Sequence, residues 1–327
     1  MISTELKTTI QGAYSRFLEA KSLKPRYGQR LMIAEIAKVL GDIDTDDEGR
    51  RSGDPAIVAV EAGTGTGKTV AYSLAAIPTA KAAGKRLVIA TATVALQEQI
   101  VYKDLPDLMR NSGLNFSFAL AKGRGRYMCL SKLDMLLQEG HAQTATAQLF
   151  EEEGFKIEVD EASQKLFTSM IEKLAGNKWD GDRDSWSTAL EDADWARLTT
   201  DHSQCTNRHC PNFGQCAFYK AREGMGKVDV IVTNHDMVLA DLALGGGAVL
   251  PDPRDTIYVF DEGHHLPDKA IGHFAHYTRL RSTADWLETT AKNLTKLLAQ
   301  HPLPGDLGKL IEQVPELARE IKTQQQF

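Results

Sequence analysis

The fold is decided by the stretch Glu61-Ala62-Gly63-Thr64-Gly65-Thr66-Gly67-Lys68-Thr69. It follows the apolar run 56–60, which is predicted to form a strand, and it precedes residues 70–76, which are predicted to form a helix. A strand, a glycine-rich turn and a helix in this order are the context that a phosphate-binding loop requires. The sequence therefore predicts the α/β class, with a parallel sheet flanked by helices.

The residues of this stretch suit a nucleoside triphosphate. Its three glycines let the backbone bend tightly and turn N–H groups toward an anion, and the following helix adds the positive end of its dipole. Lys68 can reach the outer phosphates, and Thr69 offers a hydroxyl to Mg²⁺. Ala62 stands where the pattern usually has its first glycine. We expect residues 62–69 to bind ATP with Mg²⁺; the alternative is a plain glycine-rich turn.

A second part of such a site is predicted where the apolar run 256–260 ends in Asp261 and Glu262. There Asp261 would hold the Mg²⁺ shell, and Glu262 would orient and deprotonate the attacking water. His264 lies next to them and is expected to sense the phosphate or to couple to a partner strand. The alternative for this acidic pair is a strand end that meets water.

Composition narrows the class of protein. The chain has 327 residues and a formal net charge of −6, which argues against coating nucleic acid through bulk charge, so any such contact must be a local groove. No apolar run approaches the ~20 residues that span a bilayer, and the first residues lack the pattern of a secretory signal. We expect a cytoplasmic protein without membrane contact.

Other segments complete the predicted motor fold. Buried strands are predicted at 85–90, 116–120 and 228–235, and helices at 1–20 and 31–40. Thr91 and Thr93 follow the first of these strands, at the end where parallel sheets bind ligands; a helix cap is the alternative. Gln29 precedes the nucleotide fold and could read an adenine edge, because an amide both donates and accepts; a solvated helix start is the alternative.

Four cysteines, Cys129, Cys205, Cys210 and Cys216, lie in a part of the chain with a different pattern. The last three are spaced C-x₄-C-x₅-C, without the C-x₂-C knuckle of most structural zinc sites. Thiolates from wider loops fit an iron–sulfur cube, which takes all four. Zinc and unliganded thiols are the alternatives.

Before the first cysteine runs the basic stretch Lys122-Gly-Arg124-Gly-Arg126-Tyr127. Basic residues with glycines and an aromatic ring suit the backbone and a stacked base of single-stranded DNA. A solvated basic loop is the alternative. Downstream, residues 270–327 read as mostly helical, with apolar faces at 287–298 and 310–321.

Taken together, these motifs resemble the XPD-like superfamily 2 helicases with an iron–sulfur cluster, of the bacterial DinG type. The resemblance rests on the phosphate loop, Thr-Ala-Thr-Val-Ala-Leu-Gln at 91–97, the Gly-Arg-Gly-Arg-Tyr-x-Cys run, the spaced cysteines, Val-Thr-Asn-His at 232–235 and Asp-Glu-Gly-His at 261–264. It implies a RecA-like P-loop motor domain and an ATP-dependent 5′-to-3′ DNA helicase, acting in repair on single-stranded or forked DNA and R-loops, as a monomer.

The resemblance also assigns roles and domain bounds. It implies an adenine-reading Gln29, a DNA-backbone motif with Thr91, Thr93 and Gln97, and Arg124 and Arg126 along the path of the single strand. The four cysteines would hold a 4Fe–4S cluster. The motor domain would comprise 1–125 and 226–269, the cluster insertion 126–225, and a helical arch would begin within 270–327.

One part of the family pattern is not found. Nothing in residues 270–327 resembles the second motor domain, which supplies an arginine that stabilises charge on the γ-phosphate. We therefore expect the N-terminal part of such a helicase, which binds Mg·ATP weakly and binds single-stranded DNA but does not unwind. Competing hypotheses are a cluster- or zinc-bearing DNA-binding module with a vestigial ATP site, and a metabolic P-loop kinase; the long gap between Lys68 and Asp261 argues against the kinase.

Overall fold

The computed structural model describes residues 2–49, 51–141, 161–201 and 204–275, with scattered positions between 286 and 323. The chain divides into two compact units, Met1–His273 and Phe274–Phe327. In the second unit the described positions from 286 onward, such as 313–317, are helical. The predicted apolar faces at 287–298 and 310–321 lie largely outside the described residues.

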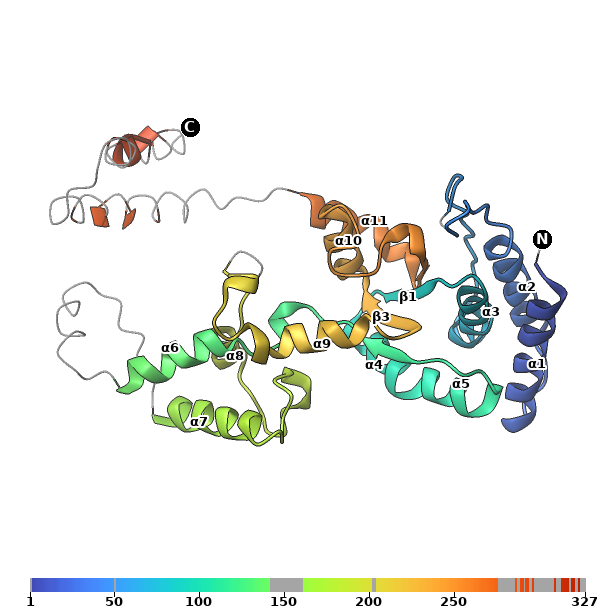
Figure 1. Ribbon diagram of the computed structural model, residues 1–327, viewed down its shortest axis with the longest axis horizontal. Coiled ribbons are helices and arrows are strands. Elements are labelled where there is room, and N and C mark those ends of the chain that lie inside the picture. The colour runs from blue at the N-terminus through green and yellow to red at the C-terminus, as the bar shows by residue number, and fades with distance from the viewer. Residues whose placement is uncertain are drawn as a thin grey trace. The chain divides into compact units, whose positions relative to one another are not determined.

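The first unit combines a four-stranded sheet with helices (Figure 1). The strands are β1 (Arg86–Thr91), β2 (Phe118–Leu120), β3 (Val230–Asn234) and β4 (Thr256–Phe260). The helices are α1 (Thr4–Ala20), α2 (Tyr27–Leu40), α3 (Lys68–Ala82), α4 (Val94–Gln99), α5 (Leu105–Ser112), α6 (Leu130–His141), α7 (Glu161–Ala175), α8 (Asp192–Leu198), α9 (Ala217–Met225), α10 (His235–Ala243) and α11 (Leu266–Phe274). Within the described residues, no helix is both long and apolar enough to cross a membrane.

The sheet is parallel, in the order β2-β3-β1-β4, which confirms the predicted class. Successive residues of β1 enter different cores: Leu87 and Ile89 pack in the core that also contains residues of α1, α2 and α3, whereas Val88 and Ala90 pack in the core on the other face. Both faces of a parallel sheet are usually covered, and its strands then read as continuous apolar runs. Because β1, β2 and β3 read as continuous apolar runs, they could be predicted from the sequence.

One predicted strand does not form. Residues 55–63 have no regular structure, and the side chain of Ile57 is 81% exposed, so the prediction of a strand at 56–60 is wrong for this structure. Apolar composition favours a strand, but only backbone hydrogen bonds to a neighbour make one. Among the described strands, β4 is the last in the sheet, and its outer edge carries no partner.

A second hydrophobic core lies in the part of the chain that contains the cysteines. It is built from Met128, Leu133, Leu136, Phe167, Met170, Trp179, Trp195 and Leu198, which come from α6, α7, α8 and the segments around them. Both buried indoles have a partner: Trp179 Nε1 donates to Asp182 O at 2.8 Å, and Trp195 Nε1 donates to Gly125 O at 2.7 Å. This core gives the loops that carry the cysteines a rigid base.

Asp229, just before β3, joins the start of this strand to Ser117, just before β2. Its Oδ2 accepts from Ser117 N at 2.7 Å and Ser117 Oγ at 2.9 Å, and lies 3.5 Å from Lys81 Nζ. Burial alone would raise the pKa of this carboxyl, but these donors outweigh it, so the pKa is lowered. We expect Asp229→Asn to lower the free energy of unfolding by about 1 kcal/mol at pH 7, a value discounted for partial exposure.

The pH dependence has a defined sign. Because the folded pKa is below that of the unfolded chain, the contribution is full above about pH 4 and is lost as the pH falls through the folded value. Denaturant unfolding of both proteins from pH 7 to pH 3 measures it, with the exposed Asp54→Asn as the control. A difference of the same size at both ends of this range would contradict the assignment.

Candidate nucleotide site and cysteine pocket

The glycine-rich loop adopts the conformation that an anion site needs. Gly65 and Gly67 have φ values of +76° and +79°, where L side chains are strained, and a Cβ on Gly67 would lie 2.1 Å from Gln29 Nε2. The 15-residue helix α3 begins at Lys68, and its N-cap, Gly67, offers no side chain to the first-turn N–H groups. These N–H groups and the helix dipole together favour a bound anion.

The side chain of Lys68, at the end of the loop, reaches the residues that follow β4. Its Nζ lies 2.9 Å from Glu262 Oε1 and donates to Ala62 O at 3.3 Å. The hydrogen bond from Lys68 holds the pKa of Glu262 below its usual range. Residues from two distant parts of the sequence therefore meet at one point, at the carboxyl end of the sheet where α/β proteins bind ligands.

Asp261 lies beside this pair in an environment that is short of positive charge. Burial, and then the neighbouring Glu262 carboxylate, raise the pKa of Asp261, while Lys68 opposes them. Its Oδ2 accepts from Tyr72 OH at 3.4 Å. A carboxylate with this shift favours a cation, and oxygen donors are what Mg²⁺ requires, so Asp261 together with the Thr69 hydroxyl is a donor set that fits this ion.

Three further residues lie around the loop, and only one of them, Gln29, was predicted from the sequence as a site residue. Gln29, predicted to read adenine, donates from Nε2 to Gly67 O at 3.3 Å, and its Oε1 accepts from Tyr14 OH at 3.3 Å. Arg26 donates to Gly65 O at 2.6 Å. Arg26 and Tyr72 were not predicted as site residues, although Tyr72 lies about one helical turn after Thr69, a spacing that places both on the same face of α3.

His264 lies at the surface of this site. Its Nδ1 is 3.4 Å from Glu262 Oε2, its side chain is 66% exposed, and its ring stands 4.0 Å from that of His265, centroid to centroid. The structure therefore brings His264 to the predicted catalytic carboxylate, on the solvent side of the site.

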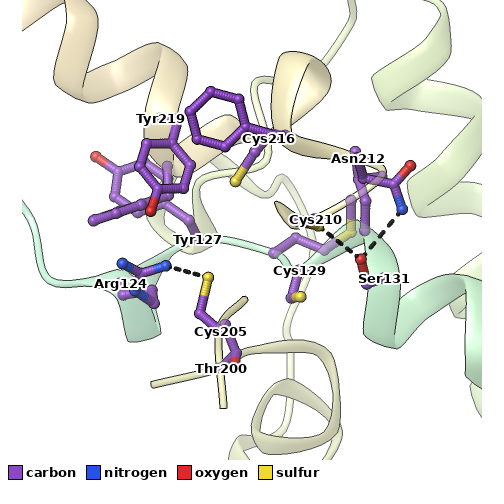
Figure 2. A pocket seen from close by; sticks show the side chains of 14 residues that line it. Arg124, Tyr127, Cys129, Ser131, Thr200, Cys205, Cys210, Asn212, Cys216 and Tyr219 are labelled. Carbon is purple, nitrogen blue, oxygen red and sulfur yellow. Dashed lines mark hydrogen bonds between the residues drawn. The ribbon is translucent and has the colours of Figure 1, made fainter. Parts of the chain in front are cut away.

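The four cysteines converge on one pocket, as Figure 2 shows. Cys129 precedes α6, Cys205 and Cys210 flank a short 3₁₀ turn, and Cys216 is the N-cap of α9. All four side chains line this pocket. No disulfide joins them. Residues from distant parts of the sequence thus present thiols to a common space.

The thiols surround this space without meeting at a single point. Among the described residues, no three side chains of His, Cys, Asp or Glu are grouped so that they could hold one metal ion. Burial raises the pKa of the Cys129 thiol, and the nearby thiols of Cys210 and Cys216 raise it further, against hydrogen bonds from backbone N–H groups. A positively charged group bound among these thiols would favour their thiolate form.

Arg124 and Arg126 are predicted to line a DNA path. In the structure, the side chains of both contact other residues of the chain. Arg124 donates to Cys205 Sγ at 2.6 Å, and its guanidinium lies 4.3 Å from the ring centroid of Phe218. Arg126 forms an ion pair with Asp184. The third basic residue of this stretch, Lys122, pairs with Asp184 at 2.8 Å and with a second carboxylate.

The predicted DNA-backbone residues after β1 differ in exposure. Thr91 and Gln97 are buried, with exposed fractions of 0% and 4%, and Thr91 Oγ1 donates to Thr93 O at 2.9 Å. Thr93 is exposed and caps α4 by accepting from Leu96 N at 3.3 Å, so the cap weighed as an alternative forms. In this structure only Thr93 of the three presents its side chain at the surface.

The chain is similar to proteins that are described as helicases, both in a family match and in longer relatives. Residues 50–151 match the family DEAD/DEAH box helicase. The chain is 40% identical over 298 residues to "ATP-dependent DNA helicase DinG" of Photobacterium profundum, covering 91% of this chain and 41% of the relative. The protein of the same name from Escherichia coli is 38% identical over 299 residues, covering 91% and 39%.

A solved structure named XPD_Helicase aligns with 92% of this chain and 48% of its own, at 15% identity and a TM-score of 0.43. The chain spans about two fifths of the length of the curated relatives that it matches. It thus contains a segment that matches DEAD/DEAH box helicases, and over 91% of its length it is similar to proteins named ATP-dependent DNA helicase DinG.

Proposed function

We propose that this chain binds Mg·ATP between the phosphate loop and Asp261-Glu262, as part of an ATP-dependent DNA helicase that translocates 5′ to 3′ along single-stranded DNA. The observation that carries this proposal is the 2.9 Å contact between Lys68 Nζ and Glu262 Oε1. It joins the residue that binds the outer phosphates to the residue that orients water. The similarity to helicases over most of the chain supports the choice of reaction.

The geometry indicates how these residues would act. A bound triphosphate would attract Lys68 away from Glu262, since a phosphate carries more negative charge than a carboxylate. Glu262 would then be free to accept a proton from water beside the γ-phosphate. Asp261 and Thr69 would hold the Mg²⁺ that neutralises the phosphate charge, and Gln29, anchored to Gly67, would face the base.

We propose that Cys129, Cys205, Cys210 and Cys216 hold a 4Fe–4S cluster. The support is that all four thiols line one pocket. A zinc site would bring four sulfurs within about 2.3 Å of one centre, whereas a cube spreads them over a larger perimeter. When bound, the cluster would supply redox capacity and a structural staple to these loops.

The DNA substrate is proposed on the family resemblance. Single-stranded or forked DNA and R-loops, met in DNA repair by a cytoplasmic monomer, are the partners that it implies. Thr93 is the exposed member of the proposed DNA-backbone motif. For Arg124 and Arg126 to contact a phosphate, each would have to leave the partner that it has in this structure, Cys205 and Asp184 respectively.

ATP hydrolysis with and without single-stranded DNA tests the proposed function. We expect DNA to stimulate hydrolysis, and Lys68→Ala to weaken Mg·ATP binding about tenfold to a hundredfold, because a charge-assisted contact to phosphate is lost. The exposed Lys7→Ala is the control. DNA binding without nucleotide binding or hydrolysis, in wild type and variant alike, would favour the DNA-binding module instead.

A further inference from the structure

His235 is a buried residue next to the proposed site to which no role has yet been given. It is the first residue of α10, directly after β3, and its exposed fraction is 0%. Its Nε2 lies 3.0 Å from Asp261 O, and its ring meets that of Phe260 edge-on, with centroids 5.8 Å apart. Because β1 lies between β3 and β4, the imidazole reaches across the end of β1 to the end of β4.

The hydrogen bond fixes which ring nitrogen carries the proton. A carbonyl oxygen only accepts, so Nε2 must donate to Asp261 O. Within the described part of the chain, Nδ1 makes no hydrogen bond. The ring with its proton on Nε2 is therefore the tautomer that the contact with Asp261 O requires.

The carbonyl that His235 holds belongs to the peptide between Asp261 and Glu262. Glu262 has a φ of +52°, in the left-handed region that costs energy for a residue with a Cβ. Rotation of this peptide is the movement that would relax Glu262 to an ordinary conformation. On the other side of Asp261, its N–H donates to Ala90 O at 2.8 Å, so both flanking peptides are fixed.

The residues on either side of His235 are held in place. Asn234 caps α10 by accepting from Met237 N at 2.8 Å, and Thr233 Oγ1 donates to Ala121 O at 3.3 Å. The neighbouring Asp236 pairs with Lys269 at 2.5 Å, away from the ring's own hydrogen bond. The imidazole therefore approaches Asp261 from a rigid element, which is what a supporting residue needs in order to position a site.

The role of this bond grows when nucleotide binds. In the present structure Glu262 is held both by its backbone and by the ion pair with Lys68. If Lys68 turns to a phosphate, the ion pair is lost, and the strained conformation then depends on the backbone contacts. Of these, two act on the peptide that would rotate: His235 Nε2 donates to its carbonyl, and its N–H donates to Asp261 Oδ1 at 3.2 Å. The contact from His235 is the one that comes from another element.

We propose that His235 is a positioning residue of the nucleotide site, which holds the 261–262 peptide so that Asp261 and Glu262 face the Mg²⁺ and the γ-phosphate. The inference rests on the proposed function, since it assumes that these carboxylates serve Mg·ATP. His235 touches neither nucleotide nor metal in this account. It acts through the backbone of the residue that does.

The test is the dependence of nucleotide affinity on Mg²⁺. The dissociation constant of a slowly hydrolysed ATP analogue is measured in Mg²⁺ and in EDTA, for wild type, His235→Phe and His235→Gln, with thermal unfolding of each. Phe fills the space without a donor, whereas the Gln amide restores an N–H. The ratio of the dissociation constant in EDTA to the dissociation constant in Mg²⁺ measures how much the metal strengthens binding. This ratio separates the metal-dependent part of binding from any general loss of stability.

We expect the ratio to fall about fivefold to tenfold in His235→Phe, which corresponds to one lost buried hydrogen bond, with the constant in EDTA unchanged. In His235→Gln the ratio should stay within about threefold of wild type. A folded His235→Phe with the wild-type ratio would overturn the inference alone. A wild-type ratio of one would overturn the proposed function, and the inference with it.

Discussion

Glu262→Gln is expected to abolish most ATP hydrolysis while strengthening nucleotide binding. Without a carboxylate the attacking water has no base, and general-base groups contribute about 10²–10⁴-fold to rates. Lys68, released from its 2.9 Å ion pair, is then available to phosphate without competition. A partly exposed pair of this kind is worth about 1 kcal/mol, so affinity should rise about fivefold.

Steady-state hydrolysis and equilibrium binding measure the two effects separately. Glu35→Gln, an exposed glutamate on α2, is the matched control and should change neither. Hydrolysis is expected to fall while nucleotide affinity rises. This combination distinguishes the loss of a base from unfolding, because an unfolded variant loses both hydrolysis and nucleotide binding. Hydrolysis at the wild-type rate by Glu262→Gln would show that this carboxylate is not the base.

Cys205→Ser is expected to remove a visible chromophore altogether. If the four thiols hold an iron–sulfur cluster, protein purified without air should be brown, with a broad visible absorption and equal amounts of iron and acid-labile sulfide. The variant leaves three cysteines around the pocket. It also removes the Sγ atom that accepts the hydrogen bond from Arg124. Loss of one ligand of four should therefore release the cluster.

Thr206→Ser, an exposed substitution next to Cys205, is the control and should remain brown. Absorption spectra and metal analysis of the three proteins decide the outcome. A colourless wild type with stoichiometric zinc would contradict the cluster and support the zinc alternative. A colourless wild type without metal would support free thiols.

The parts of the site that local chemistry defines could be predicted from the sequence. A phosphate loop is a continuous stretch whose glycines and lysine have fixed offsets, so residues 62–69 could be read directly. Asp261 and Glu262 could be paired with it because the carboxyl ends of parallel strands meet at one edge. The convergence of the cysteines followed from counting ligands, and the structure brings all four to one pocket.

What the sequence did not reveal depends on partners that are distant along the chain. Ile57 is apolar, yet it remains exposed because no described strand pairs with its segment. Arg124 has the composition of a DNA contact, but its partners Cys205 and Phe218 follow much later in the chain. His235 follows an apolar strand in the sequence, and its bond to Asp261 exists only through the order of the strands.

A crystal structure of the chain with Mg²⁺ and a non-hydrolysable ATP analogue shows whether the loop and Asp261 form one Mg·ATP site. We expect the triphosphate along the loop 63–69, Lys68 turned from Glu262 to the outer phosphate, and Mg²⁺ between Thr69 and Asp261. A nucleotide bound elsewhere, or bound at the loop with the Lys68–Glu262 ion pair intact and Asp261 remote from the metal, would contradict it.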